Sequence, residues 1–372
     1  MKYYIIAGEA SGDLHGSNLV RELKKADPGA TIRCWGGDLM AQQGAVLVKH
    51  YRDLAFMGFA EVIKNLPTIL KNLKFCKADI TSFAPDVLVL IDYPGFNIRM
   101  AAWAKEQGLR VVYYISPQVW AWKESRVKTI RKVVDKMLVI LPFEEAFYKK
   151  HDYKVVYVGH PLVQVVEDFL SHAKPRLKQH KPIVAILPGS RRQEITKKLP
   201  LMLEASRHFP AYQFIVARAP GLEESFYAQF LENYAGTATV ANQTYQLLSE
   251  SSAALVTSGT ATLETALFGV PQVVCYKGSA ISFAIARRLV KIKYISLVNL
   301  IMDKPLVKEL IQDDLTVENL VVELKRILED REAVPRMHQD YSSLHQLLRQ
   351  GGNASETAAR EILAVVQAEA VP

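Results

Sequence analysis

Short runs of β-branched and aromatic residues alternate with amphipathic stretches along the whole of this 372-residue chain. Strands that alternate with helices form parallel sheets whose two faces the helices cover. The pattern therefore predicts an α/β fold. The strands are expected near residues 3–7, 31–35, 87–91, 111–115, 137–140 and 155–158, and then near 183–187, 213–216, 253–257 and 272–275.

The length of the chain exceeds what one hydrophobic core usually holds and indicates two domains of similar size. The basic segment from Pro161 to Pro182 separates them, because a fresh apolar run begins at Ile183. We expect two Rossmann-like domains that face each other across a cleft, residues 1–165 and residues 180–344. The C-terminal residues 345–372 are expected to be helical and to pack back onto the first domain.

Composition is that of a globular protein, with 49% hydrophobic and 23% charged residues. No apolar run approaches the ~20 residues that span a bilayer, and the N-terminus enters a strand without the layout of a signal peptide. We therefore expect a cytoplasmic protein. Cys34, Cys76 and Cys275 form no CxxC pair and the histidines show no metal-binding spacing, so we expect reduced thiols and no metal site.

The formal charge of +8 indicates an acidic partner, which can be nucleic acid, anionic lipid or a phosphorylated substrate. The densest basic stretch runs from Lys123 to Lys136. No RNA-recognition, zinc-finger or helix-turn-helix pattern accompanies it, so a solvated helix face is favoured over a nucleic-acid site. Anionic lipid is left open.

The segment from Leu255 to Glu264 joins an apolar run to a helix through Ser258, Gly259 and Thr260. Backbone N–H groups at such a turn, with the helix dipole behind them, suit a phosphate. Glu264 lies one helical turn after Thr260, where a carboxylate can accept hydrogen bonds from a ribose diol. The segment fits a nucleotide-sugar site in the second domain. The alternative is an ordinary capped helix with a solvated Glu.

A second turn, from Pro188 to Arg192, follows the expected strand at 183–187. Gly189 allows close approach of a ligand, Ser190 can cap the next helix, and Arg191 offers a planar fork for a pyrophosphate. Because open α/β sheets bind ligands at the carboxyl ends of their strands, we expect this turn and the Ser258 turn to act on one diphosphate. A solvated Arg191 is the alternative.

Two segments of the first domain can carry chemistry. The loop from Gly8 to Gly16 lies between a strand and a helix and can admit substrate close to the backbone. It lacks GxGxxG spacing and an acidic residue placed to bind a dinucleotide ribose, so we expect no NAD, no FAD and no other cofactor. Asp92 follows the apolar run 87–91, where it can take a proton from an attacking hydroxyl; a helix cap is the alternative.

Two further segments carry apolar surface. Trp120 and Trp122 follow Pro117 and can form a wall for sugar or acyl chains, or pack in the core. The stretch 54–75 is apolar with charges that are nearly all Lys, which fits helices in a membrane interface, although a buried helix would look similar. The residues expected to contact lipid are Phe56, Met57, Phe59, Ile63, Leu66, Ile69 and Leu70.

These segments make the chain resemble the lipid-A-disaccharide synthase family. Its signatures are matched in order by GEASGD, LAFMGFAEV, IDYPGFN, YYISPQVWAW, LPFEEAFY, VGHP, LPGSR, SGTATLE and YISLVNL. The resemblance implies a glycosyltransferase B fold and an inverting hexosyltransferase of lipid A and lipopolysaccharide synthesis that uses no metal. It implies transfer of 2,3-diacylglucosamine from UDP to 2,3-diacylglucosamine 1-phosphate, which gives a β-1,6-linked disaccharide 1-phosphate and UDP.

By position, the resemblance makes Asp92 the general base for the acceptor 6-hydroxyl and places Glu9 beside the substrate as a second catalytic candidate. It puts Tyr276 near the uracil pocket. It assigns donor binding to Ser190, Arg191, Ser258, Gly259, Thr260, Glu264, Tyr276 and Asn299.

The partners that follow are the UDP-diacylglucosamine donor, the diacylglucosamine 1-phosphate acceptor and an anionic membrane surface, without nucleic acid. The expected location is the cytoplasmic face of the inner membrane, with peripheral attachment, and a homodimer is left open. Two other functions fit parts of the sequence: a UDP-N-acetylglucosamine 2-epimerase-like enzyme and a non-catalytic nucleotide-sugar sensor. An epimerase would need no apolar surface helix, and a sensor would not need Asp92.

Overall fold

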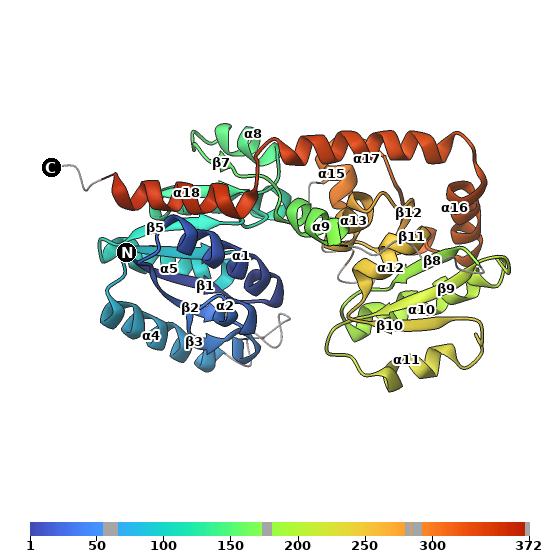
Figure 1. The fold of residues 1–372 in the computed structure, drawn as a ribbon, viewed down its shortest axis with the longest axis horizontal. Coiled ribbons are helices and arrows are strands. Elements are labelled where there is room, and N and C mark those ends of the chain that lie inside the picture. The colour runs from blue at the N-terminus through green and yellow to red at the C-terminus, as the bar shows by residue number, and fades with distance from the viewer. Residues whose placement is uncertain (55–65, 173–180, 280–282, 284–291, 369–372) are drawn as a thin grey trace. The chain divides into compact units, whose positions relative to one another are not determined.

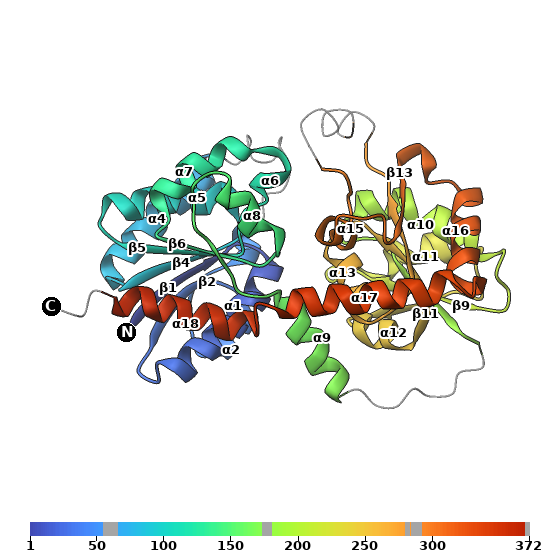
Figure 2. The same cartoon turned by 90° about the horizontal axis from the view of Figure 1, so that it is seen from above.

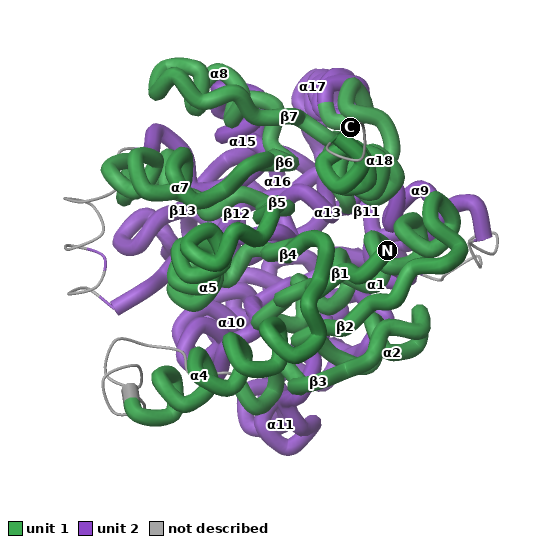
Figure 3. Tube along the Cα trace, turned by 90° about the vertical axis from the view of Figure 1, so that its left-hand side faces the viewer, with its two compact units in different colours: residues 1–161, 348–372 green, residues 162–347 purple. Residues whose placement is uncertain are grey.

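The computed structural model describes residues 1–54, 66–172, 181–279, 283 and 292–368. The chain divides into two compact units, one of residues 1–161 with 348–372 and one of residues 162–347 (Figure 3). Each unit contains one parallel sheet with helices on both of its faces (Figures 1 and 2). This architecture confirms the expected class of two Rossmann-like α/β domains.

The sheet of the first unit has the strand order β3-β2-β1-β4-β5-β6-β7. Its strands are β1 (Lys2–Ala7), β2 (Thr31–Gly36), β3 (Val46–His50), β4 (Val87–Ile91), β5 (Arg110–Tyr114), β6 (Lys136–Val139) and β7 (Val156–Tyr157). Successive residues of β1 point to opposite faces, so Tyr4 and Ile6 join one buried cluster while Tyr3 and Ile5 join the other. Burial on both faces explains why the central strands are nearly continuous apolar runs.

The helices of the first unit come from both ends of the chain. They are α1 (Ala10–Ala26), α2 (Asp38–Gln42), α4 (Leu66–Phe83), α5 (Pro94–Glu106), α6 (Val119–Trp122), α7 (Val127–Val133), α8 (Phe143–Lys149) and α18 (Ala354–Gln367), with short 3-10 turns η1 (Tyr51–Leu54) and η2 (Glu124–Arg126). Residues of α4, α5 and α7 belong to the cluster around Tyr4, whereas those of α1 and α18 belong to the cluster around Tyr3. The C-terminal α18 packs against α1 and β5 (Figure 1).

The sheet of the second unit has the strand order β10-β9-β8-β11-β12-β13. Its strands are β8 (Ile183–Leu187), β9 (Gln213–Arg218), β10 (Ala238–Ala241), β11 (Ser251–Thr257), β12 (Gln272–Tyr276) and β13 (Lys308–Ile311). All its paired strands run parallel. Their carboxyl ends therefore lie along one edge, which is where this class of sheet binds ligands.

The helices of the second unit flank that sheet. They are α9 (Pro161–His172), α10 (Arg192–Ser206), α11 (Glu224–Leu231), α12 (Thr244–Glu250), α13 (Thr260–Leu267), α15 (Leu297–Met302), α16 (Val317–Glu329) and α17 (Ala333–Arg349), with the 3-10 turn η3 (Gln312–Asp314). α16 packs against α10 and against β11 and β12, and α12 packs against β8 and β11. In the described part of the chain, no helix is both long and apolar enough to cross a bilayer.

Candidate functional site

A cavity of about 420 Å³ opens at the carboxyl ends of β8, β9 and β11 in the second unit. Its walls are the turns that follow these strands and lead into α10 and α13. Parallel strands bring their C-terminal turns to one edge of a sheet, which is why segments distant in sequence meet here. The volume lies within the range of small-molecule sites. We call this space the donor cavity.

Six of the eight residues expected to bind the donor line this cavity. They are Ser190, Arg191, Ser258, Gly259, Thr260 and Glu264. Thr260 begins α13, and Arg191 directly precedes α10. Two helix N-termini therefore border one cavity, and their unpaired N–H groups and dipoles favour an anion there.

Gly259 gives the turn before α13 its shape. Its φ of +138° is one that L side chains rarely adopt, although nothing lies within 4 Å of the position that a Cβ would take. The backbone conformation rather than the available space thus requires glycine. The missing side chain also leaves the backbone at the start of α13 uncovered.

The two neighbouring arginines lie in different surroundings. Arg191 lines the cavity with an exposed side chain, and its guanidinium is 3.5 Å from the carboxylate of Glu194. Arg192 is absent from the cavity lining, and its guanidinium lies 4.6 Å from the ring centre of Phe226. An exposed pair such as Arg191–Glu194 contributes little to stability, so Arg191 can turn to an anionic ligand at low cost.

Glu264 is oriented by a residue that the sequence did not single out. The hydroxyl of Tyr245 donates a hydrogen bond to Oε1 of Glu264 at 2.7 Å. Burial raises the pKa of Glu264, and the bond from Tyr245 opposes that shift. A buried carboxylate is stabilised by further hydroxyl donors, which is what a ribose diol would supply.

Two basic residues at this edge were also missed. Arg218 ends β9 and lines the cavity; its Nε is buried without a hydrogen-bond partner, while Nη1 donates to Glu224 at 2.8 Å. Lys198 is buried beside the wall, where its ammonium donates to Oγ1 of Thr257 and where burial lowers its pKa. Arg218 could have been found from the sequence, because it lies just after the strand expected at 213–216. Lys198 could not, because its contact with Thr257 joins a helix to a strand that is distant in sequence.

Two expected donor residues do not line this cavity. The side chain of Asn299 is buried and bonds to the backbone of Val307, which fixes the chain around the start of β13. Its own backbone N–H is capped by Ser296 at the N-terminus of α15. Tyr276 lies near Phe283, with 6.2 Å between the ring centres. The structure thus gives Asn299 a structural place and leaves Tyr276 apart from the diphosphate turns.

In the first unit, Asp92 lies between the end of β4 and the start of α5. Asp92 and Tyr93 both have left-handed backbone conformations, with φ of +44° and +51°. Such conformations cost free energy for residues other than glycine and persist only where neighbours fix them. Here the carbonyl of Asp92 accepts hydrogen bonds from the hydroxyl of Tyr113 at 2.5 Å and from the amide of Asn97 at 2.8 Å. We call this arrangement the Asp92 corner.

The environment of Asp92 changes its acidity. Burial, with a further contribution from the negative charge of Glu9, raises the pKa of Asp92 to about 6, against a small opposing effect of a hydrogen bond from the backbone of Tyr93. Glu9 follows β1 and Asp92 follows β4, and these strands pair at Ala7 and Ile91, so the two candidate catalytic residues lie at the same edge of the sheet. A carboxyl group with a pKa close to the working pH is well matched to general-base catalysis.

Two further residues of the segment from Gly8 to Gly16 have structural roles. A Cβ at Gly8 would come within 2.3 Å of the ring of Tyr93, so glycine is needed for the ring to pack there. The buried carboxylate of Asp13 accepts hydrogen bonds from the backbone of Gly37 and Met40 at the start of α2. The conspicuous acidic residue Asp13 is therefore structural.

The apolar segments divide between core and surface. Trp120 packs edge-on against Phe143 at 5.0 Å, whereas Trp122 is 50% exposed with Lys123 4.3 Å from its ring centre. Leu70 is 55% exposed, whereas Ile69 is partly buried against the core cluster around Tyr4. Leu66 begins α4. The other expected lipid contacts, Phe56, Met57, Phe59 and Ile63, lie outside the described residues.

The three cysteines are buried and unpaired. Burial raises the pKa of the Cys34 and Cys275 thiols to about 12, so both are protonated at neutral pH. Within the described ranges, no three His, Cys, Asp or Glu side chains converge as metal ligands.

Comparison with known proteins gives a consistent result over the whole chain. A family model described as "Lipid-A-disaccharide synthetase" matches residues 3–363. The lipid-A-disaccharide synthase of Trichlorobacter lovleyi is 38% identical over 372 residues, which cover 98% of this chain and 97% of that protein. The synthase of Geobacter metallireducens is 38% identical over 363 residues, which cover 95% and 94%.

Among solved structures, the UDP-GlcNAc 2-epimerase from Neisseria meningitidis bound to UDP-GlcNAc is similar to this chain with a TM-score of 0.67. The match covers 98% of this chain and 100% of that one, at 14% sequence identity. At that identity the likeness shows a shared fold and does not extend to the reaction.

Proposed function

This chain belongs to the lipid-A-disaccharide synthetase family and is a glycosyltransferase, and we propose that it joins UDP-2,3-diacylglucosamine to 2,3-diacylglucosamine 1-phosphate. The products are the β-1,6-linked disaccharide 1-phosphate and UDP. The observation that carries the proposal is the donor cavity, where two helix N-termini and Arg191 suit a nucleoside diphosphate. The perturbed carboxyl group of Asp92 adds a base for the acceptor.

In this proposal the donor cavity binds the UDP part of the donor. The N-termini of α10 and α13, with Ser190 and Arg191, bind the diphosphate, and Glu264 accepts hydrogen bonds from the ribose hydroxyls. The same groups stabilise the negative charge that develops on the departing UDP. Preorganised dipoles and cations of this kind lower the barrier without rearrangement during the reaction.

Asp92 acts on the acceptor. Its carboxylate takes the proton of the 6-hydroxyl, and the oxygen attacks the anomeric carbon of the donor sugar. The bond from that carbon to the diphosphate breaks, and its electron pair leaves with UDP. A single displacement of this kind inverts the anomeric centre. Glu9 assists indirectly, since its charge helps keep the pKa of Asp92 near the working pH.

A mass-spectrometric assay with both lipid substrates in detergent tests the reaction. We expect a tetra-acylated disaccharide phosphate and an equal amount of UDP. UDP binding without that product would contradict the transferase proposal and make UDP-N-acetylglucosamine the next substrate to assay. Absence of UDP binding would contradict the assignment of the donor cavity.

The enzyme works as a peripheral protein at the cytoplasmic face of the inner membrane. Support comes from the exposed apolar side chains of Leu70 and Trp122 in the first unit, and from the cations Lys123 and Arg126 beside the Trp122 ring. Indole rings and basic side chains of this kind are favoured at lipid headgroups.

Co-flotation with anionic liposomes tests this attachment. A variant with Phe56, Met57 and Phe59 changed to Ser should stay in the soluble fraction while it still binds UDP. Val322, which is 63% exposed on α16 in the second unit, provides the control Val322→Ser, which should float like the wild type. Flotation of the triple variant would show that another surface binds the lipid.

A further inference from the structure

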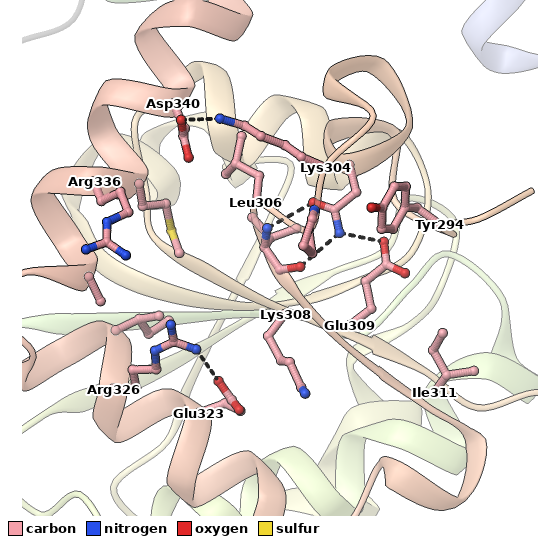
Figure 4. A pocket seen from close by; sticks show the side chains of 16 residues that line it. Tyr294, Lys304, Leu306, Lys308, Glu309, Ile311, Glu323, Arg326, Arg336 and Asp340 are labelled. Carbon is pink, nitrogen blue, oxygen red and sulfur yellow. Dashed lines mark hydrogen bonds and ion pairs between the residues drawn. The ribbon is translucent and has the colours of Figure 1, made fainter.

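A second and larger cavity lies in the second unit between β13, α16 and α17 (Figure 4). Its volume is about 660 Å³, and it shares no lining residue with the donor cavity. Most of its surface is apolar. The apolar residues are Pro305, Leu306, Val307, Ile311, Ile327, Ala333 and Met337. The glycosyl transfer described above makes no use of this space, which we call the β13 cavity.

Two polar side chains of the β13 cavity, Asn299 and Glu309, are already bonded within the protein. The amide of Asn299 donates to the carbonyl of Val307 and to Glu309, both at 2.9 Å, and its oxygen accepts from the N–H of Val307. The carboxylate of Glu309 also accepts from the backbone of Ile295 and from Ser296. These groups cannot recognise a nucleobase or a sugar without breaking bonds that hold the chain together.

Four cationic side chains complete the lining. Lys304 pairs with Asp340, and Arg326 lies 3.6 Å from Glu323 (Figure 4). Both cations are therefore compensated by carboxylates of the same cavity.

The other two cations are Lys308 and Arg336. The carboxylate nearest to Arg336 is that of Glu332, which lies outside the lining, is highly exposed and is 3.9 Å away. Within the described part of the chain, Lys308 forms no ion pair. The lining thus holds four cations and three carboxylates, Glu309, Glu323 and Asp340, so a net positive charge lies beside an apolar surface.

We propose that the β13 cavity binds an anionic amphiphile, a single alkyl or acyl chain that ends in a phosphate monoester. The chain would contact the apolar surface around Leu306 and Met337, and the phosphate would bind Lys308 and Arg336. Arginine binds phosphate through paired hydrogen bonds and lysine through its point charge. The cavity volume lies within the range of sites that enclose ligands of this size. Since the two cavities share no lining residue, the protein binds the amphiphile and UDP at the same time.

Isothermal titration of the full chain with dodecyl phosphate below its micelle concentration, in saturating UDP, tests this proposal. We expect one saturable site per chain, with affinity reduced about tenfold or more by Lys308→Gln and by Arg336→Gln, since each removes one charge-assisted contact. Lys325→Gln is the matched control. It removes an exposed cation of α16 that has the same kind of i,i+4 carboxylate partner but does not line the cavity.

The apolar part of the proposal is tested with Leu306→Asn and with inorganic phosphate as the ligand. The Leu306→Asn variant should bind dodecyl phosphate far more weakly than the wild type does. The wild type should likewise bind inorganic phosphate far more weakly than dodecyl phosphate. If the wild type bound inorganic phosphate as tightly as dodecyl phosphate, the ligand would be a simple anion and the proposal of an amphiphile would be wrong. If Lys325→Gln and Lys308→Gln lost equal affinity for dodecyl phosphate, or if UDP displaced dodecyl phosphate, the proposed site would be wrong. Unchanged UDP binding in each variant confirms that it is folded and separates this outcome from any failure of the donor cavity.

Discussion

The donor cavity and the Asp92 corner both lie at the carboxyl ends of parallel strands, but different groups build them. The donor cavity relies on two helix N-termini and the exposed Arg191, so many groups contribute its positive potential. The Asp92 corner relies on one carboxyl group, held on a strained backbone by Tyr113 and Asn97. Binding of an anion can be distributed over several donors, whereas removal of a proton needs one group with the right pKa. Single substitutions should therefore weaken the first site gradually and disable the second.

The largest expected effect is that of Asp92→Asn. The amide cannot take the acceptor proton, so kcat should fall about 10³-fold, within the range for loss of a general base. The dissociation constant of UDP, measured by calorimetry, should not change. Retention of most activity would contradict the role of Asp92, and a parallel loss of UDP binding would remove the contrast between the two sites.

Next in size is the effect of Arg191→Ala on UDP affinity. Loss of one charge-assisted contact should weaken UDP binding by about 1.5–3 kcal/mol. Arg192→Ala is the matched control, because Arg192 lies over Phe226 outside the donor cavity. Equal effects of the two substitutions would indicate general charge attraction instead of a specific diphosphate contact.

A smaller effect concerns the stability of the Asp92 corner. The folded protein raises the pKa of Asp92 from 3.8 to about 6, so the fold favours the protonated form. The resulting stability is fully present below pH 3.8 and is lost as pH rises through about 6. At pH 8, Asp92→Asn should therefore be more stable than the wild type by up to about 3 kcal/mol, since the pKa rises by about two units and each unit corresponds to about 1.4 kcal/mol. Urea unfolding at pH 8 and pH 4 checks this, and a gain that persists at pH 4 would point to another cause.

The smallest expected effect is a shift of the pH profile in Glu9→Gln. In the wild type, kcat/KM should rise with pH and level off above an apparent pKa of about 6. The charge of Glu9 contributes to that value, so its removal should move the rising limb to lower pH by about half a unit. A shift to higher pH, or a profile that keeps its position, would show that Glu9 acts in another way.

The sequence predicted the central strands well and missed three of the four edge strands. The strands β1, β4, β8 and β11 are apolar because helices cover both of their faces, and an apolar run is easy to recognise. The strands that were missed, β3, β10 and β13, are all edge strands with partly exposed residues. Edge strands carry polar residues that limit further pairing, so their pattern resembles that of loops.

The candidate site shows a similar division. Ser190, Arg191 and the Ser258 turn could be found because a parallel sheet brings its C-terminal turns to one edge. The partner of Glu264, Tyr245, could not be found, since its hydroxyl reaches Glu264 from another helix. The raised pKa of Asp92 could not be found either, because it depends on burial and on Glu9, which is distant in the sequence. Such contacts depend on packing, which local sequence patterns do not encode.

The helix α18 has a consequence for the order in which the protein is completed on the ribosome. Its residues Ala358, Ile362 and Val366 belong to the same buried cluster as Tyr3 and Ile5. Synthesis proceeds from the N-terminus, so residues 162–347 are all made before the first unit receives its last helix. A chain released before residue 354 would hold a completed second unit and an N-terminal sheet with one apolar face partly uncovered, which is the kind of surface that proteases and chaperones recognise.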